Sequence, residues 1–447
     1  MIEQLDTDYL IIGAGAAGMA FADELVSTSD TVRIILVDRR ATPGGHWNDA
    51  YRFVTLHQPS LYYGVNSESL ETSPDHRASA DEIIAYYARV LDKLCETGRV
   101  RFFGESDYLG EGRFRSKANG GQEVQVTVQR KTVDATDSRV TVPSTRPPEY
   151  SVAEGINSVP VNALANLERE WSRYVVIGAG KTGIDAVLQL LDLGTDPDRI
   201  TWVISNDAWM INRKMMMPAD FAKETTKHLR AFCFSRSVED YFRRCEEAGW
   251  FMRLDPSVPA PRFRCATVNS TELQALRTVQ DIVRLGRVRR IDSTTIVLDG
   301  GTIPTDGNVL HVDCSADGLV LRPERPVFDG SHIILQPVTL CQPAMSAAFI
   351  GHLEMTDMSD DRKNNMAWPC PHPMVPRDYF QSIHSMGHNM MAWSFRQNRW
   401  LMTRRLSAMT HISFWSKVWA HLGFLLWFFG AALTVKRFLR TYEEADG

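Results

Sequence analysis

One supersecondary pattern occurs twice in the sequence, and this repetition limits the chain to a small set of folds. A short apolar strand, a glycine-rich turn and a helix follow one another at Tyr9–Val26 and again at Tyr174–Leu193. A second apolar strand follows each copy, at Arg33–Val37 and at Ile200–Ile204. Strand, helix and parallel strand make a right-handed βαβ unit. The sequence therefore predicts an α/β protein with two Rossmann-type dinucleotide-binding domains.

The first glycine-rich turn, G-A-G-A-A-G at 13–18, has the full context that the G-x-G-x-x-G motif requires. A strand precedes it, a helix follows it, and Asp38 stands at the end of the next strand, twenty positions beyond Gly18. In such a turn the helix N-terminus attracts phosphate and the acid binds ribose hydroxyls. The residues predicted to hold this dinucleotide are Gly13, Gly15, Ala16, Ala17, Gly18, Asp38 and Arg39.

The second turn, G-A-G-K-T-G at 178–183, has the same context and is predicted to bind a second dinucleotide. An acid at the end of the following strand favours NADH, and an arginine there favours NADPH. Neither occupies that end, although Asp207, Arg213 and Lys214 lie nearby, so the choice between NADPH and NADH stays open. The residues predicted to bind here are Gly178, Gly180, Lys181, Thr182, Gly183, Ser205 and Asn206.

The order of the two units predicts how the chain divides. Residues 1–168 and 305–380 are the two parts of an FAD-binding domain, and residues 169–304 are an inserted NAD(P)-binding domain. The inserted domain carries a helical insert at about 215–265, and a helical segment, 381–447, ends the chain. Smaller patterns predict a helix at 80–95, an antiparallel meander containing 100–103 and 124–128, and strands at 295–298, 309–312 and 347–350.

Net charge and the first residues exclude some classes of function. A formal charge of -5 argues against a nucleic-acid partner, which would require a basic domain or stripe. Acidic residues (Glu3, Asp6 and Asp8) precede the first apolar run, where a secretory signal requires basic ones. We therefore expect a cytoplasmic protein.

The seven cysteines are an odd number and contain no C-x-x-C pair. This spacing favours free thiols in a reducing compartment over a disulfide scaffold. It also argues against a disulfide reductase, because such an enzyme needs paired cysteines beside its flavin. His372, His384 and His388 lie near one another without an acid or thiol at ligand spacing, so no metal site is expected.

The last apolar run, 418–435, contains one ionisable residue and is flanked by Lys417, Lys436, Arg437 and Arg440. Its eighteen residues are at the lower limit for a membrane-spanning helix. Three interpretations compete: a membrane anchor, a helix buried against the body, and a contact between two copies in a homodimer. The short length and two glycines favour burial or association with a membrane surface over a true span.

Two further motifs extend the pattern around the first dinucleotide unit. The sequence P-G-G-H-W occupies 43–47, and L-H-Q-P-S-L-Y-Y occupies 56–63. With the two glycine turns, these motifs resemble the class B flavin monooxygenases, which include the flavin-containing and the Baeyer–Villiger monooxygenases, over residues 8 to about 355. The resemblance implies FAD in the first unit and NADPH or NADH in the second. It also implies that Gly45, His46 and Trp47 pack near the flavin, and that His57 and Gln58 lie beside its reactive atoms. A hydrogen-bonded loop histidine is the alternative for His57.

The chain departs from that family at three places. The bridging F-x-G-x-x-x-H-x-x-x-W signature is absent from 150–164, the A-T-G turn becomes A-T-D at 135–137, and Ser205 replaces the arginine that selects NADPH. The resemblance still implies an NAD(P)H-dependent flavin monooxygenase, which oxygenates a small organic substrate with O2 through a flavin C4a-(hydro)peroxide. A membrane-associated NAD(P)H:quinone oxidoreductase and a non-catalytic flavin-binding sensor are the alternatives.

Overall fold

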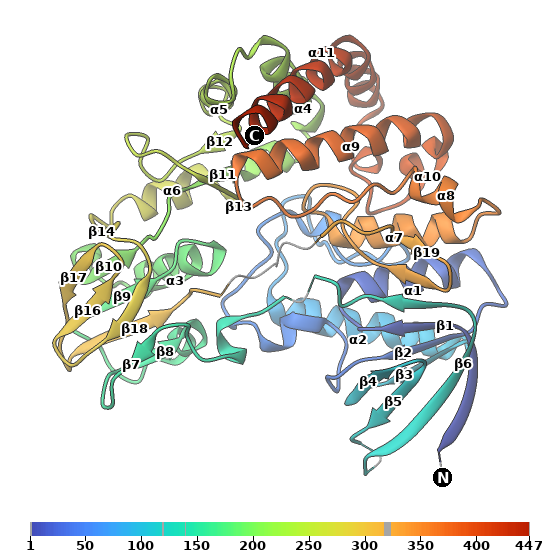
Figure 1. Ribbon diagram of the computed structural model, residues 1–447, viewed down its shortest axis with the longest axis horizontal. Helices are drawn as coiled ribbons and strands as arrows, with labels where there is room; N and C mark the ends of the chain where they lie inside the picture. Colours follow the sequence, from blue (N-terminus) through green and yellow to red (C-terminus); the bar gives the residue numbers. More distant parts are fainter. Residues whose placement is uncertain (1, 119, 139, 317–322, 447) are drawn as a thin grey trace.

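The computed structural model describes residues 2–118, 120–138, 140–316 and 323–446. It contains two separate α/β units that lie side by side, with a helical lobe and the C-terminal helices above them (Figure 1). The α/β class with two Rossmann-type units is therefore confirmed.

The first sheet has β1 (Glu3–Ile12) at its centre, in the order β19-β20-β6-β1-β2-β3. Strands β20, β6, β1, β2 and β3 are parallel neighbours, and β6 is also the last strand of an antiparallel meander of β4, β5 and β6. The bounds of the other strands are β2 (Ile34–Val37), β3 (Val100–Phe103), β4 (Ser106–Gly110), β5 (Arg113–Ser116), β6 (Gln122–Asp134), β19 (Phe328–Asp329) and β20 (His332–Ile334).

Helix α1 (Ala16–Thr28) is buried from Gly18 to Val26, because it packs against the first sheet's core and against α7 (Pro343–Glu354). Two of its buried residues are acidic. Asp23 accepts hydrogen bonds from the backbone N–H groups of Asn66 and Ser67, and Glu24 accepts one from Trp400 Nε1 at 2.8 Å. A capping box between Ser79 and Glu82 begins α2 (Ala80–Glu96).

The second sheet repeats this plan in the order β14-β10-β9-β18-β8, with all neighbouring strands parallel. Its elements are β8 (Ser158–Pro160), β9 (Arg173–Ile177), α3 (Lys181–Asp192), β10 (Ile200–Val203), α6 (Ser270–Leu276), β14 (Asp281–Val283) and β18 (Val309–Asp313). Two strands of this sheet, the edge strand β8 and its neighbour β18, therefore come from outside residues 169–304. A smaller sheet of β7 (Ser151–Val152), β15 (Val288–Ile291), β16 (Thr295–Leu298) and β17 (Gly301–Pro304) packs beside it.

The inserted lobe combines a three-stranded sheet with two helices. The sheet contains β11 (Ala208–Asn212), β12 (Phe251–Met252) and β13 (Arg262–Val268), and the helices are α4 (Phe221–Phe234) and α5 (Val238–Glu247). Its core is aromatic, and Tyr241, Phe251 and Phe263 are fully buried there. Within the predicted insert of about 215–265, α4 and α5 are helical, whereas β13 was not expected.

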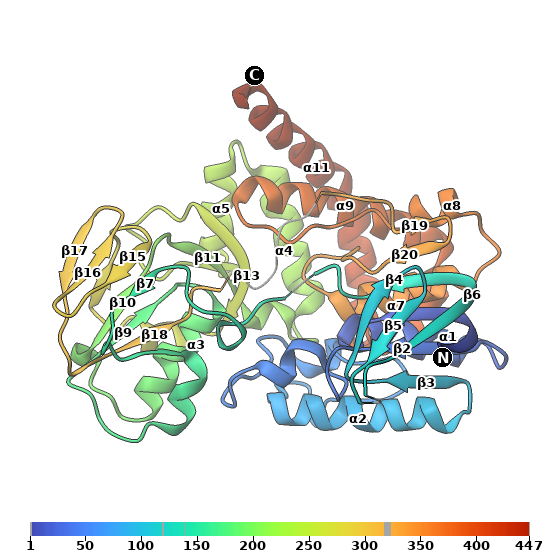
Figure 2. The ribbon, with the colours of Figure 1, turned by 60° about the horizontal axis from the view of Figure 1, so that its bottom comes forward.

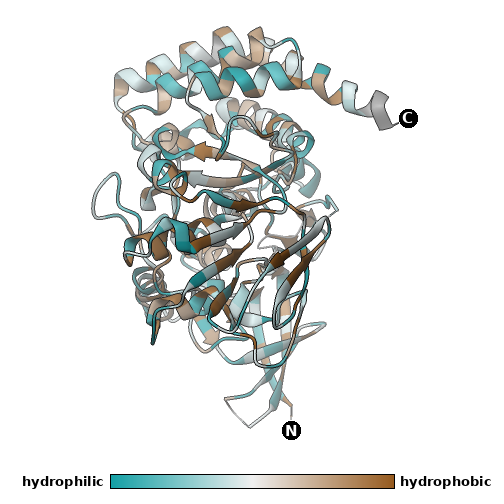
Figure 3. Ribbon diagram, turned by 90° about the vertical axis from the view of Figure 1, so that its left-hand side faces the viewer, coloured by the Kyte–Doolittle hydropathy of each residue, from teal (hydrophilic) through white to brown (hydrophobic). Residues whose placement is uncertain are grey.

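The chain ends in α9 (Pro376–Arg396), α10 (Asn398–Thr403) and α11 (Phe414–Asp446), and α11 projects beyond the body (Figure 2). Helix α11 packs on α4, where Gly423 lies against Thr226 and Gly430 against Cys233. Within the described residues, no single helix combines the length and apolarity of a membrane span; Phe414–Gly423 and Leu426–Tyr442 meet both criteria only as a pair bent by 47°. Figure 3 shows hydrophobic stretches on the strands in the middle of the body and a mixture of hydrophobic and hydrophilic residues along the long helices above them.

Two predictions of secondary structure were wrong. Residues 347–350 lie in the buried helix α7, not in a strand. The prediction failed because a short apolar run does not distinguish a helix from a strand when every face of the element is buried. Residues 100–103 form β3, a parallel strand of the first sheet, and the antiparallel meander consists of β4, β5 and β6.

Candidate functional site: a cavity shared by two dinucleotide units

A cavity of about 1120 Å³ lies where the two α/β units meet. Both glycine turns line it, together with the P-G-G-H-W turn, the 54–58 segment and parts of the inserted lobe. This volume exceeds the usual range of about 300–1,000 Å³ for a single small-molecule site. The cavity therefore has room for more than one ligand.

The first glycine turn has the backbone that a dinucleotide requires. Gly13 adopts a φ of +104°, and a Cβ on Gly18 would lie 1.9 Å from the Gly13 carbonyl oxygen, so both positions require glycine. Gly15 precedes α1 without a side-chain cap, and Gly15, Ala16 and Ala17 line the cavity. The uncapped N–H groups of the first helical turn are therefore directed at the place where a pyrophosphate would bind.

The second turn repeats this geometry closely. Gly178 has a φ of +125°, and a Cβ on Gly183 would lie 2.0 Å from the Gly178 carbonyl oxygen. Gly180 precedes α3 with φ −79° and ψ −174°, against −78° and −174° at Gly15, and it too lacks a side-chain cap. Gly178, Gly180, Lys181 and Thr182 line the cavity. The residues present thus fit a dinucleotide at each turn.

The strand ends that follow the two turns differ. Asp38 is buried and accepts hydrogen bonds from the N–H groups of Ala14 at 2.6 Å and Arg40 at 2.8 Å, while Arg39 is exposed and lines the cavity. In the second unit Ser205 is exposed and lines the cavity, whereas Asn206 does not. Asp207 forms a two-pronged ion pair with Arg284, at 2.8 and 3.1 Å.

The P-G-G-H-W turn packs directly on the first glycine turn. Gly44 donates its N–H to the Ala14 carbonyl at 2.9 Å, and both Gly44 and Gly45 have positive φ. Trp47 is buried and donates from Nε1 to the Tyr63 hydroxyl at 2.7 Å, so it forms a fixed wall of the cavity. Burial and the nearby Arg40 lower the pKa of His46 to about 4, which keeps this imidazole neutral at pH 7.

His57 and Gln58 also line the cavity. Burial, with Lys181 and Arg213 nearby, lowers the pKa of His57 to about 3, and its Nδ1 atom is buried without a hydrogen-bond partner among the described residues. A buried unpaired nitrogen is costly unless a ligand satisfies it. Gln58 is held in place because its Oε1 accepts a hydrogen bond from Gln342 Nε2 at 2.7 Å.

Sequence reasoning missed an aspartate motif at each sheet centre. At the end of β6, Asp134 Oδ1 accepts hydrogen bonds from the N–H and the hydroxyl of Thr136, which lies against Gly13. At the end of β18, Asp313 Oδ1 accepts the same pair from Ser315, and the intervening residue, Cys314, lies against Gly178. A repeated D-x-[S/T] after the closing strand of each unit was the signal in the sequence.

A bridge between the two units was missed as well. Tyr51, next to the first unit, donates its hydroxyl to Asp185 Oδ2 on α3 at 2.6 Å, and the same carboxylate pairs with Lys181. Burial and the Asp185 charge raise the pKa of Tyr51 well above its ordinary value, so Tyr51 remains a hydrogen-bond donor. Lys181 is therefore positioned from both sides of the cavity.

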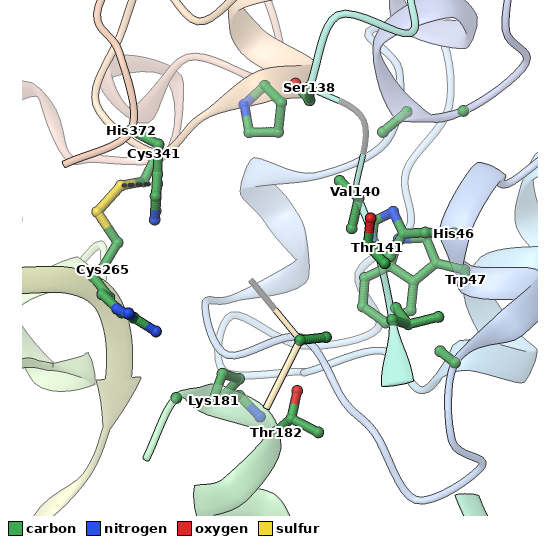
Figure 4. Close-up of a pocket in the computed structure, with 18 of the residues that line it drawn as sticks. His46, Trp47, Ser138, Val140, Thr141, Lys181, Thr182, Cys265, Cys341 and His372 are labelled. Atoms are coloured by element: carbon green, nitrogen blue, oxygen red, sulfur yellow. Dashed lines mark hydrogen bonds between the residues drawn. A yellow bond between two sulfur atoms is a disulfide. The ribbon is translucent and has the colours of Figure 1, made fainter. Parts of the chain in front are cut away.

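The expectation that all cysteines are free was wrong. Cys265 on β13 and Cys341 before α7 form a disulfide across 76 residues of sequence, in the cavity wall opposite His46 and Trp47 (Figure 4). One sulfur or nitrogen atom from each of Cys265, Cys341 and His372 lies within 4.8 Å of the others. Sequence spacing gave no sign of this pair because each cysteine comes from a different unit of the fold.

Residues 7–232 match the family model described as pyridine nucleotide-disulphide oxidoreductase. The match covers both glycine turns, the P-G-G-H-W turn and the 56–63 motif. The chain belongs to this family. Its cofactors are accordingly FAD and a nicotinamide dinucleotide, which fits the two turns that face one cavity.

The chain is similar to three other proteins at different levels. An uncharacterised protein of Mycobacterium tuberculosis (strain ATCC 25618 / H37Rv) is 45% identical over 426 residues, which cover 91% of this chain and 79% of that protein. A probable FAD-binding monooxygenase of Acinetobacter baylyi, AlmA, is 23% identical over 237 residues, 49% of this chain and 47% of that protein. A solved flavin-containing monooxygenase from Stenotrophomonas maltophilia has 17% identity and a TM-score of 0.47, over 78% of this chain and 98% of that one.

Proposed function

We propose that this chain is an NAD(P)H-dependent flavin monooxygenase that oxygenates a small organic substrate with O2. The observation that carries the proposal is that both dinucleotide turns, His57 and Gln58 line one and the same cavity. The P-G-G-H-W turn and the partial similarity to a probable FAD-binding monooxygenase support it. FAD, when bound, supplies the two-electron chemistry that links the nicotinamide to O2.

The residues of the chain have separate roles in this proposal. Gly13, Gly15 and Gly18 let the pyrophosphate of FAD approach the start of α1. Asp38 accepts two hydrogen bonds from backbone N–H groups, and its remaining lone pairs accept hydrogen bonds from the ribose hydroxyls of FAD. Trp47 excludes water from its side of the cavity. Neutral His57 and Gln58 orient the reacting groups by hydrogen bonds, since neither carries a charge at pH 7.

Anaerobic mixing with NADPH or NADH tests the reductase half. We expect the flavin absorbance of the holoenzyme to be lost, and retention of the full absorbance with both nicotinamides would make the proposal wrong.

The oxygenase half is tested by the incorporation of labelled oxygen from O2 into candidate substrates. We expect His57→Ala and Gln58→Ala to divert O2 to hydrogen peroxide. If the double variant still forms one labelled product for each NAD(P)H consumed, the role assigned to His57 and Gln58 is wrong.

We infer that NADPH is the preferred reductant. Ser205 is at the end of β10, and Arg287 lines the same cavity after the neighbouring strand β14, whereas Asp207 is neutralised by Arg284. Arg287 is exposed, and its ion pair with Glu149 is long, at 3.8 Å. An arginine in this position suits the 2′-phosphate of NADPH. We expect Arg287→Ala to raise the KM for NADPH at least tenfold and leave that for NADH unchanged. Arg289→Ala is the control, because Arg289 is exposed, pairs with Asp299 and does not line the cavity.

We also propose that α11 attaches the protein to an anionic membrane surface. Its outer side carries large apolar side chains that are between 46% and 74% exposed, at spacings of mostly three or four residues: Phe414, Trp415, Trp419, Leu422, Leu426, Phe429 and Leu433. Lys436 and Arg440 are exposed beyond this stripe. Tryptophan and leucine suit the lipid interface, and the cations complement anionic headgroups.

Sedimentation with vesicles tests this attachment. We expect the holoenzyme to sediment with phosphatidylcholine vesicles that contain phosphatidylglycerol and to remain in solution with phosphatidylcholine alone. Trp419→Glu with Leu426→Glu should abolish binding, whereas Phe395→Glu should not, because Phe395 is equally exposed but lies on α9. If the protein instead forms dimers without vesicles, and the double variant is a monomer, the exposed apolar side chains of α11 contact a second copy. That result would overturn the membrane proposal.

An NAD(P)H:quinone oxidoreductase is the second candidate, and the exposed α11 stripe favours it because quinones reside in membranes. Rapid quinone reduction with negligible oxygen uptake would select it over the monooxygenase.

A further inference from the structure

Arg213 is one of the cations that follow the second unit's strand β10 and that a 2′-phosphate of NADPH would suit. In the structure it begins the short 3-10 helix η6 (Arg213–Met216), directly after β11 of the inserted lobe. It is 8% exposed and does not line the cavity. Arg213 is therefore not placed to bind a cofactor or a substrate, and its buried charge has another role.

The guanidinium of Arg213 joins three parts of the fold. Its Nε donates a hydrogen bond to the carbonyl oxygen of His57 at 2.8 Å, and its Nη2 donates to the Thr267 carbonyl of β13 at 3.3 Å. The same Nη2 atom pairs with Glu272 Oε2 on α6 at 2.8 Å. Because the N–H groups of a guanidinium point in fixed directions within one plane, these partners are held in fixed positions relative to one another.

Glu272 is itself fixed by contacts with both units. Its Oε2 accepts a hydrogen bond from the N–H of Asn269 at 2.8 Å, in the capping box that begins α6, and its Oε1 lies 3.3 Å from a terminal nitrogen of Arg77 in the first unit. Helix α6 packs against α3, which begins at the second glycine turn. A continuous set of contacts thus runs from the second unit, through Glu272 and Arg213, to His57.

The segment that contains His57 and Gln58 is consequently held from two sides. Gln342 donates a hydrogen bond to the Gln58 side chain at 2.7 Å, and Arg213 holds the backbone of His57. A side chain follows the backbone that carries it, so the contact of Arg213 with the His57 carbonyl sets where the imidazole lies in the cavity.

The ion pair of Arg213 with Glu272 matters for geometry more than for stability. The two side chains are 9% and 18% exposed. At such burial the loss of hydration offsets most of the attraction between the charges, and an apolar pair of similar size would stabilise the fold as well. The directed hydrogen bond to His57 is the consequence that an apolar pair would not provide.

We propose that Arg213 is a positioning residue for the oxygenation reaction: supported by Glu272, its hydrogen bond to the His57 carbonyl holds the His57–Gln58 segment in place in the cavity. The inference rests on the proposed function, which assigns to His57 and Gln58 the orientation of the reacting groups. A displacement of about 1 Å in such a segment lowers a rate by about a hundredfold. Without Arg213, O2 is consumed without oxygenation.

The titration of His57 tests this positioning without turnover. Burial lowers the pKa of His57 to about 3, and nearby basic groups contribute to the shift: Lys181, Arg213, His372 and Arg77. In NMR spectra of the holoenzyme labelled with 15N-histidine, with His57→Ala to assign the signal, we expect this imidazole to stay neutral down to about pH 5.

Arg213→Lys separates position from charge. Lysine keeps the positive charge but has one nitrogen at its tip, which does not replace both Nε and Nη2. We expect the pKa of His57 to return toward its ordinary 6.5 in this variant, a rise of about two pKa units or more. Arg213→Met lacks every donor and should give the same result; if one of the two variants does not fold, the other carries the test.

The ratio of labelled product to NADPH consumed is the second readout. In folded, FAD-loaded Arg213→Lys we expect this ratio to fall about tenfold or more, with a matching rise in hydrogen peroxide. Arg253→Lys is the matched control, because Arg253 is a partly buried arginine of the same lobe that pairs with Glu246 at 2.6 Å, donates to the Val258 carbonyl at 3.1 Å and does not line the cavity. It should keep the wild-type ratio and the wild-type pKa of His57.

The other outcomes overturn the proposal in different ways. A wild-type pKa of His57 in Arg213→Lys would show that the segment is held without the guanidinium. A raised pKa with an unchanged ratio would show that the segment moves without consequence for the reaction, and equal losses in Arg253→Lys would show a general loosening of the lobe. If the wild type forms no labelled product, the proposed function is at fault. The titration of His57 then still decides whether Arg213 holds the segment.

Discussion

Helices α1 and α3 begin with the same turn but have different surroundings. Counted from the glycine before each helix, the eighth and ninth residues are Asp23 and Glu24 in α1, but Leu188 and Gln189 in α3. Helix α1 is buried from Gly18 to Val26 by the first sheet, by α7 and by the chain near Trp400, whereas α3 is buried on one face and partly accessible on the other. The glycines thus determine the local backbone of each turn. The elements packed over each helix determine how much free energy is needed to open that turn. We expect the first unit to retain its dinucleotide and the second to exchange it.

The largest effect should come from the glycines that pack each helix on its strand. A methyl group at Gly18 or Gly183 would lie about 2 Å from a backbone carbonyl, which cannot move aside, and such overpacking costs about 3 kcal/mol or more. We expect Gly18→Ala to yield little folded yellow protein. Gly183→Ala should keep FAD but lose reduction by NADPH.

FAD content and thermal melting distinguish the two variants. Gly307→Ala is the control, because a methyl there meets no atom within 4 Å. Equal loss of FAD from Gly18→Ala and Gly183→Ala would contradict the expectation that the first unit retains its dinucleotide and the second exchanges it.

The buried acid of α1 should make the first unit sensitive to pH. Burial raises the pKa of Asp23 to about 6, against an ordinary 3.8. The folded protein then binds this proton more tightly than the unfolded chain. The contribution of Asp23 to the free energy of unfolding is complete below the pKa that this group has in the unfolded chain. The contribution is lost as pH rises through about 6, and it amounts to about 1.4 kcal/mol for each unit by which folding raises the pKa. Asp23→Asn should remove this slope from urea unfolding curves, and an unchanged slope would show that Asp23 titrates normally.

A smaller effect is expected where a methyl group meets only the dinucleotide. Nothing lies within 4 Å of a Cβ on Gly180, and its φ is ordinary, so Gly180→Ala should melt like the wild type. The methyl would keep the pyrophosphate from the start of α3, and we expect the Kd for NADPH to rise about tenfold, which is about 1.4 kcal/mol. Isothermal titration measures this change; unaltered affinity would mean that the second turn does not hold the pyrophosphate.

The smallest effect concerns the bridge between the units. Tyr51→Phe removes the hydrogen bond to Asp185 but leaves the ion pair of Asp185 with Lys181, so the loss should be about 1 kcal/mol. We expect slower flavin reduction by NADPH with unchanged FAD content. A rate equal to that of the wild type would show that Lys181 needs no support from the first unit.

The sequence predicted the parts of this molecule that are local. Both glycine turns, helix α2 and the inserted helices could be predicted because each depends on residues within a few turns of one another. The position of Asp38 beside the first turn followed from the same pattern. The helix α7 could not be predicted, since burial on all sides removes the periodicity that identifies a helix.

The rest of the site depends on contacts between distant residues. Cys265 with Cys341, Gln58 with Gln342 and Tyr51 with Asp185 each join segments that the fold brings together, so their spacing in the sequence carries no signal. The D-x-[S/T] motifs at 134–136 and 313–315 are different. They are local and repeated, and comparing the two units residue by residue would have found them.

The covering of α1 has a consequence for how the chain folds during synthesis. Helix α1 is made early, yet α7 and Trp400, which bury α1 and its Glu24, come much later in the chain, and Trp400 is 376 residues from Glu24. The strands and helices of the second unit, from β8 to β18, are complete earlier and contiguous in the chain. Domains of a nascent chain usually mature from the N-terminus onward. Here we expect the inserted unit to complete its own contacts before the first unit, because α1 stays uncovered until α7 and Trp400 have been made.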